Sequence, residues 1–82
     1  MGRKVIEVSV DSIHIPREGR ITPRMMERLK KQLEAQGQIE PFMALRLERL
    51  DKWAVYNWPD TGLVEAAAAL GWDTLLLSVR DE

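Results

Sequence analysis

Cationic and anionic side chains are concentrated in different parts of this sequence. Residues 17–31 hold six basic residues against two acidic ones, whereas residues 57–82 hold one basic residue against five acidic ones. Guanidinium and ammonium groups bind phosphate and carboxylate oxygens, so the basic stretch suits a nucleotide, a nucleic-acid backbone or the acidic half of a second copy. For Lys30 and Lys31, at the end of this stretch, we favour the alternative of a solvated helix face.

Few other side chains offer catalysis or metal binding. The one histidine, His14, lies where the alternation places it away from the core, and no catalytic triad can be assembled around it. Asp60, Glu65 and Asp73 are suited in principle to a hard cation, but the sequence has no spaced acidic loop of the calcium-binding type. We therefore expect these acids to cap helices and face solvent, keep Asp60 as the one candidate metal ligand, and assign no catalytic residue.

Three apolar side chains are candidates for contact with a partner. Trp58 stands in an Asn-Trp-Pro-Asp turn with no periodic reason to be buried, which makes it an anchor for a partner or a base. The alternative is that its ring covers the start of the following helix. Leu76 falls on the side of its strand opposite the core, and we expect it beside Tyr56 on a neighbouring strand, as part of an oligomer surface.

Composition limits the classes of protein that this chain can represent. Its 82 residues, 45% of them hydrophobic, suffice for a single domain over residues 1–82. Without cysteine, disulfides, thiolate nucleophiles and zinc ribbons are excluded. The net charge of −1 gives no global attraction to nucleic acid or lipid, and no apolar run approaches the ~20 residues that cross a bilayer. We expect a cytoplasmic protein without membrane contact, and its small size makes a homodimer plausible.

The first half of the chain predicts a strand followed by a helix. Residues 4–10 alternate between apolar and polar side chains, and Ile13 and Ile15 extend the alternation until Pro16. A polar loop leads to Thr22-Pro23, a typical cap and first turn of a helix. Apolar residues at helical spacing then continue to Gly37, which we expect to end the helix as a left-handed cap.

The second half predicts a hairpin, a helix and a last strand. Residues 43–48 and 53–55 alternate on either side of a polar turn, which is typical of a β-hairpin. Asp60 or Thr61 is expected to cap a helix that ends at Gly71, the C′ residue of a Schellman motif. Residues 74–80 alternate again. The order β-α-β-β-α-β predicts an α+β fold, a small mixed sheet with two main helices.

The element order and one motif resemble the ParB/sulfiredoxin N-terminal domain. Gly37-Gln38-Ile39-Glu40-Pro41 matches the Gly-x-x-Gln-Pro step of that family, with Glu40 in place of the usual Gln. Trp53 matches an aromatic residue of the third strand, Ala66-Ala67 a pair of small residues in the second helix, and Gly71 its closing glycine. The resemblance covers most of the chain. It implies the ParB/sulfiredoxin-like fold.

The family's Gly-Glu-Arg-Arg or Gly-His-Arg box, which opens the second helix, has no counterpart here. This chain has residues 57–63, Asn-Trp-Pro-Asp-Thr-Gly-Leu, at that place. In the family the box and the helix N-terminus hold the phosphates of CTP or ATP. The resemblance therefore implies a phosphate site at Arg20, Arg24, Thr61 and Gly62 that could take CTP or ATP with Mg²⁺. Because the box is missing and Asp60 would repel a phosphate, we nevertheless expect no cofactor.

Two hypotheses follow from these residues. The first is a stand-alone ParB-like domain that acts as a non-catalytic binding or regulatory module in plasmid partition, mobile elements or DNA-associated regulation. It would pair with itself or with a fuller ParB-like protein through residues 57–65, and without a helix-turn-helix we do not expect sequence-specific DNA binding by this chain alone. The second is a small nucleotide-binding hydrolase or nuclease in which Arg20, Arg24 and the Thr61-Gly62 amides hold phosphate while Asp60 recruits Mg²⁺.

Overall fold

The computed structural model of the chain describes residues 2–15 and 21–81 and contains one five-stranded sheet with two helices. In chain order the elements are β1 (Arg3–Ser9), a 3₁₀ turn (Val10–Ser12), β2 (Ile13–His14), α1 (Pro23–Gln36), β3 (Phe42–Leu47), β4 (Lys52–Val55), α2 (Asp60–Leu70) and β5 (Thr74–Arg80). The strand order is β1-β5-β3-β4-β2. Because β1–β5 and β3–β4 are antiparallel while β3–β5 and β2–β4 are parallel, the sheet is mixed and the α+β prediction is confirmed.

The first strand ends earlier than its alternation predicts. At residues 10–12 the chain makes a 3₁₀ turn, in which the Ser12 hydroxyl donates to the carbonyl of Ser9 at 2.7 Å. The segment after the turn becomes β2 and pairs with β4 at the opposite edge of the sheet. The expected continuation of one strand through Ile13 and Ile15 is therefore wrong. The apolar positions change from even-numbered residues up to Val10 to odd-numbered ones at Ile13 and Ile15, and the turn between them leaves both Val10 and Ile13 buried.

The first helix begins as its sequence predicts. The Thr22 hydroxyl accepts a hydrogen bond from the amide of Met25 at 3.1 Å, and Pro23 occupies the first turn, where its missing N–H has no consequence. At the other end Gly37 has a φ of 70° but a ψ of −165°, so it is not the left-handed cap that we expected. This extended ψ directs the chain out of the helix and toward β3.

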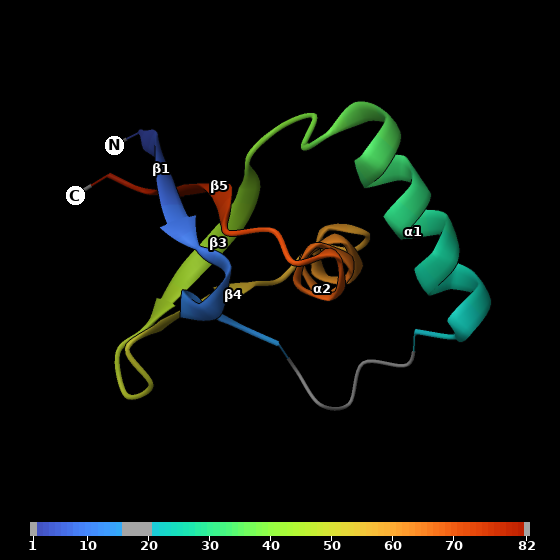
Figure 1. Ribbon diagram of the computed structural model, residues 1–82. Helices are drawn as coiled ribbons and strands as arrows, with labels where there is room; N and C mark the ends of the chain where they lie inside the picture. Colours follow the sequence, from blue (N-terminus) through green and yellow to red (C-terminus); the bar gives the residue numbers. More distant parts are fainter. Residues whose placement is uncertain (1, 16–20, 82) are drawn as a thin grey trace.

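The second helix lies between the sheet and α1 (Figure 1). Its buried residues face both neighbours, because small side chains at Gly62, Ala66 and Ala67 allow close packing. The helix ends in the predicted Schellman motif: Gly71 has a φ of 81° and a ψ of 25°, and the amide of Trp72 donates to the carbonyl of Ala67 at 3.0 Å.

The sheet has one face covered by the helices and one open face. Residues Phe42 and Ala44 of β3 are buried on the covered face, together with the buried side chains of β5, which are Leu75, Leu77 and Val79. The hairpin β3–β4 is confirmed, but Met43, Leu45 and Leu47, the apolar residues of its alternation, lie on the opposite face. The open face thus carries apolar side chains that the core does not use.

One side chain joins the loop after α1 to the sheet. The Gln38 carboxamide accepts a hydrogen bond from the amide of Leu76 at 2.8 Å and donates to the carbonyl of Leu76 at 2.7 Å. It therefore pairs with β5 as a neighbouring strand would, just before β3 begins. Its nitrogen also donates to the carbonyl of Glu40 at 3.1 Å, which fixes the loop that leads into β3.

We expect Gln38→Ala to lower the free energy of unfolding by about 1–2 kcal/mol, because the amide and carbonyl of Leu76 would lose a paired partner. Urea denaturation measures this loss. Gln36→Ala is the matched control, since Gln36 is exposed at the end of α1, and its effect should stay within about 0.5 kcal/mol. Equal effects of the two substitutions would contradict a structural role for Gln38.

Candidate functional site

The candidate site is the start of α2, where the chain leaves the hairpin. Pro59 occupies the N-cap position, and no side chain caps the helix. The amide of Thr61 donates to the carbonyl of Asn57 and the amide of Leu63 to that of Pro59, both at 2.9 Å. The expected cap at Asp60 or Thr61 is therefore wrong. Backbone carbonyls of the turn satisfy amides that a side-chain cap would otherwise take.

Gly62 is buried between α1 and the ring of Trp58. A Cβ at this position would lie 2.8 Å from Leu29 Cδ1 and 3.0 Å from Trp58 Cζ3. The indole therefore covers part of the helix start, as one of its two interpretations predicts, while 59% of Trp58 remains exposed. The other interpretation, an anchor for a partner, is compatible with this exposure. The structure gives Gly62 a packing role, and its phosphate role stays a prediction.

A cavity of about 190 Å³ opens beside this helix start. Its apolar lining includes Leu33, Phe42 and Leu63. Its acidic part comes from two segments, with Glu40 in the loop before β3 and Asp60 in the first turn of α2. The structure thus brings together two carboxylates that are 20 residues apart in the sequence.

The electrostatics of this cavity raise the pKa of Asp60. Desolvation by partial burial is the larger cause, and the negative charge of Glu40 is the second. A helix N-terminus by itself favours the ionised carboxylate, so burial and the neighbouring acid outweigh the helix dipole here. An additional anion would therefore meet unfavourable charge at this place.

The raised pKa of Asp60 has a consequence for stability. Because its pKa is raised, Asp60 binds its proton more tightly in the folded chain than in the unfolded one. Its contribution to stability is therefore fully present below the ordinary pKa of aspartate and is lost as pH rises through the raised pKa. Asparagine does not titrate, so Asp60→Asn should not lose stability in this way. Between the ordinary and the raised pKa of Asp60, the variant should therefore become increasingly more stable than the parent chain. Thermal unfolding between pH 3 and 7 measures the gain.

The cause of the shift can be checked directly. Glu40→Gln should lower the pKa of Asp60, which an NMR titration of the Asp60 carboxyl carbon reports. Glu48→Gln is the control, since Glu48 is exposed in the β3–β4 turn and does not line the cavity. An Asp60 titration unchanged by Glu40→Gln would show that the two carboxylates do not interact.

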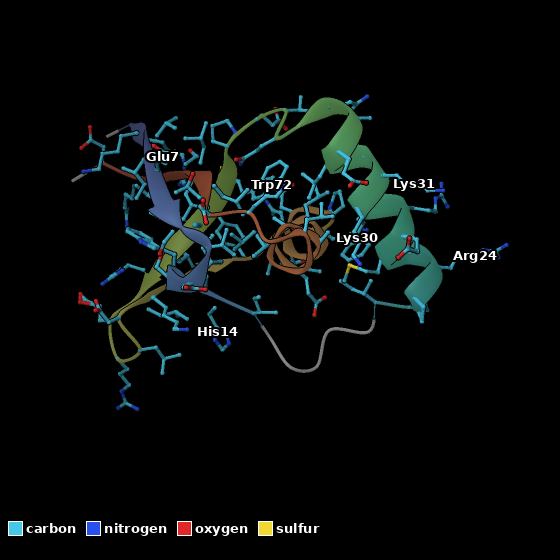
Figure 2. The ribbon with its side chains drawn as sticks, in the orientation of Figure 1. Glu7, His14, Arg24, Lys30, Lys31 and Trp72 are labelled. Carbon is cyan, nitrogen blue, oxygen red and sulfur yellow. The ribbon has the colours of Figure 1, made fainter. Side chains whose placement is uncertain are left out.

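The basic candidates do not gather around this cavity. Arg24 is exposed in the first turn of α1, nine residues before Leu33, and thus ~13 Å along the helix axis from the cavity wall. Figure 2 shows its side chain pointing away from α2. Arg20 lies outside the described residues. Of the four predicted phosphate ligands, the structure places only Thr61 and Gly62 side by side, in the first turn of α2.

The partner-binding candidates fall on two surfaces. Trp58 is at the start of α2, whereas Leu76, 39% exposed, is on the open face of the sheet, where its neighbour on β1 is Glu7. Tyr56 is exposed just after β4, and β3 separates β4 from β5. The expectation that Tyr56 lies on the strand beside Leu76 is therefore wrong, because β5 pairs with β1 and β3.

Other candidates for chemistry remain isolated. Among residues 2–15 and 21–81, no group of three or more His, Asp or Glu side chains is placed to hold a metal ion. His14 is half-buried in β2 and lies at the lower margin of the molecule in Figure 2. Neither of the two described helices is both long and apolar enough to span a bilayer.

Sequence reasoning missed Gln38 and the cavity acid Glu40 as site residues. Both stand in the Gly37–Pro41 step that carried the resemblance, but their contacts depend on β5 and α2. It also missed the apolar open face, which includes Val5 and Leu45. The positions of Val5 and Leu45 in alternating strands could have indicated an apolar face. Alternation alone, however, does not say which face of a sheet the helices cover.

The arrangement of this sheet and its two helices is the ParB/sulfiredoxin-like fold. Sulfiredoxin from Arabidopsis thaliana superposes with a TM-score of 0.71 at 16% identity, over 96% of this chain and 86% of that chain. The C-terminally truncated chromosome-partitioning protein ParB from Caulobacter crescentus, complexed with CTP-γ-S, superposes with a TM-score of 0.75 at 13% identity, over 96% of this chain. The match spans 45% of that ParB chain. No family model and no curated protein sequence matches the chain.

Proposed function

We propose that this chain is a non-catalytic binding module whose contact surface is residues 57–65. The observation that carries this proposal is the composition of the α2 start: Glu40 and Asp60 line its cavity, and Trp58, two residues before Asp60, is 59% exposed. A partly exposed indole next to carboxylates is suited to a protein partner with an apolar pocket and basic side chains. The resemblance suggests a fuller ParB-like protein as that partner.

A nucleoside triphosphate fits these residues poorly. The ParB structure from Caulobacter holds a CTP analogue, but in this chain the cavity at the α2 start is lined by two carboxylates, and Arg24 points away from α2. The amide of Thr61 already donates to the carbonyl of Asn57. These three observations favour the binding module over the alternative of a small nucleotide hydrolase or nuclease.

The biological setting of the proposal comes from the resemblance. A ParB-like module of this kind would work in the cytoplasm, in plasmid partition, mobile-element maintenance or DNA-associated regulation. It would reach DNA through its partner and not by sequence-specific contacts of its own.

Amide NMR titrations of the ¹⁵N-labelled chain with CTP, ATP and GTP, each with and without Mg²⁺, test the nucleotide alternative. We expect no saturable shift of residues 57–65 at millimolar nucleotide. Saturable shifts confined to residues 17–24 and 57–65 would instead favour the nucleotide-binding enzyme, and hydrolysis assays of Asp60→Ala would then follow.

A titration with unlabelled full-length ParB protein tests the partner. The expected result is shifts at residues 57–65 that Trp58→Ala abolishes and Leu50→Ala preserves. Leu50 is the matched control because it is exposed in the turn between β3 and β4. Shifts that survive Trp58→Ala, or that fall elsewhere, would contradict this contact surface.

A further inference from the structure

We infer that the outer edge of β1 pairs with the same edge of a second copy of the chain, in an antiparallel arrangement centred on Val5. β1 ends the strand order β1-β5-β3-β4-β2 and pairs only with β5 among the described strands. It has seven residues and no proline. Such an edge presents unpaired backbone N–H and C=O groups that another strand can bind.

The hydrogen bonds at both ends of β1 show which residues carry these groups. The amide of Asp81 donates to the carbonyl of Gly2 at 3.1 Å, and the amide of Val10 donates to the carbonyl of Asp73 at 2.9 Å. Even-numbered residues therefore direct their backbone groups toward β5. Because these directions alternate along an antiparallel strand, Arg3, Val5, Glu7 and Ser9 direct theirs outward.

The same odd-numbered residues place opposite charges on the open face of the sheet. The Arg3 guanidinium donates to the Ser78 hydroxyl at 3.0 Å and to the Ser78 carbonyl at 2.6 Å. The Glu7 carboxylate accepts from the Thr74 hydroxyl at 2.8 Å. β5 thus holds both charged groups over the open face, and neither forms an ion pair with a described residue. Between them Val5 is 57% exposed.

Antiparallel pairing about Val5 makes this pattern complementary to itself. Val5 then faces Val5 of the second copy, and Arg3 faces Glu7 on both sides of the two-fold axis. All three residues direct their backbone groups outward, so each facing pair exchanges two backbone hydrogen bonds. Opposite charges directly across an antiparallel pair stabilise it. The result is one continuous sheet through both copies.

The neighbouring registers do not place Arg3 opposite Glu7. Pairing about Ile6 places Arg3 opposite Ser9 and Glu7 opposite Val5, so that neither charge has an opposite charge directly across. Pairing about Lys4 places two ammonium groups against each other. Charge complementarity therefore selects the register about Val5, in which Lys4 lies opposite Ile6 on the covered face.

Charge exchange tests this interface in the whole chain. Light scattering and sedimentation velocity over a concentration series at low salt should show reversible dimerisation. Glu7→Arg and Arg3→Glu should each weaken it by about tenfold or more, because like charges would face each other, and the double exchange should restore it to within about threefold. A chain that stays monomeric up to millimolar concentration, or a dimer insensitive to both single reversals, would overturn the inference.

Two further variants test the edge and its register. Val5→Pro removes an N–H that points away from β5, so it should abolish dimerisation and leave the far-UV circular dichroism spectrum unchanged. Since the chain has no cysteine, Val5→Cys should give a disulfide-linked dimer on mild oxidation, whereas Ile6→Cys should not. Equal cross-linking by the two variants would contradict the register. Trp58→Ala should dimerise normally, which separates this interface from the proposed contact surface at residues 57–65.

Discussion

Gly62→Val should lower the free energy of unfolding by about 1–3 kcal/mol, which is the usual range for overpacking a tight contact. The position has no room for a side chain, since even a Cβ would lie 2.8 Å from Leu29 Cδ1 and 3.0 Å from the Trp58 ring. Leu29 is buried in the contact between α1 and α2, so it cannot move aside without opening a gap in the core. Urea denaturation with a check of the m-value measures the loss.

A second substitution separates the two neighbours of Gly62. Trp58→Ala removes the exposed neighbour and leaves the buried one, so in that background Gly62→Val should remain destabilising if Leu29 sets the limit. Gly2→Val is the control for a glycine with open space around it, because nothing lies within 4 Å of its ideal Cβ. A loss below about 0.5 kcal/mol for Gly62→Val would mean that α1 is not held closely against α2.

The parts of the fold that are fixed by residues close together in the sequence could be predicted from it. Thr22-Pro23 carries its own cap and first-turn chemistry, and the Schellman motif at Gly71 needs only a residue that tolerates a positive φ. The 3₁₀ turn at residues 10–12 could not be predicted in the same way. Besides the local bond from the Ser12 hydroxyl to the carbonyl of Ser9, it is fixed where the amide of Val10 donates to the carbonyl of Asp73, 63 residues away. The local signal is a change of phase in the alternation, from even-numbered apolar residues up to Val10 to odd-numbered ones at Ile13 and Ile15.

The candidate site was predicted less well, because its residues meet only through the sheet topology. The start of α2 was identified as a candidate site because residues 57–63 replace the Gly-Glu-Arg-Arg or Gly-His-Arg box of the ParB/sulfiredoxin family. Its acidic cavity was not, since Glu40 and Asp60 come together only when the hairpin returns the chain beside the end of α1. Arg24 was assigned from its position at a helix start, but the α2 start lies against Leu29 and Leu33, in the middle and the second half of α1. The packing of α1 against α2 therefore places Arg24 away from the predicted phosphate site.

Leu77→Ala should be the most destabilising single truncation, with a loss of about 2–5 kcal/mol. Leu77 is 0% exposed, and it lies on β5 between Ile6 on β1 and Phe42 on β3. Truncation would leave a cavity that the flanking strands cannot close, because both are held to β5 by backbone hydrogen bonds. Thermal and urea unfolding measure the effect, and a small domain with a typical stability of about 5 kcal/mol would retain little of it.

Leu76→Ala is the matched control, because it removes the same atoms one residue earlier in the same strand. Leu76 faces the open side of the sheet, so its truncation should cost at most about 1 kcal/mol, and both the proposed contact surface at residues 57–65 and the β1 edge should still function. A loss as large as that of Leu77→Ala would mean that the open face is covered in solution. The difference between these two leucines therefore measures directly which face of β5 the protein buries.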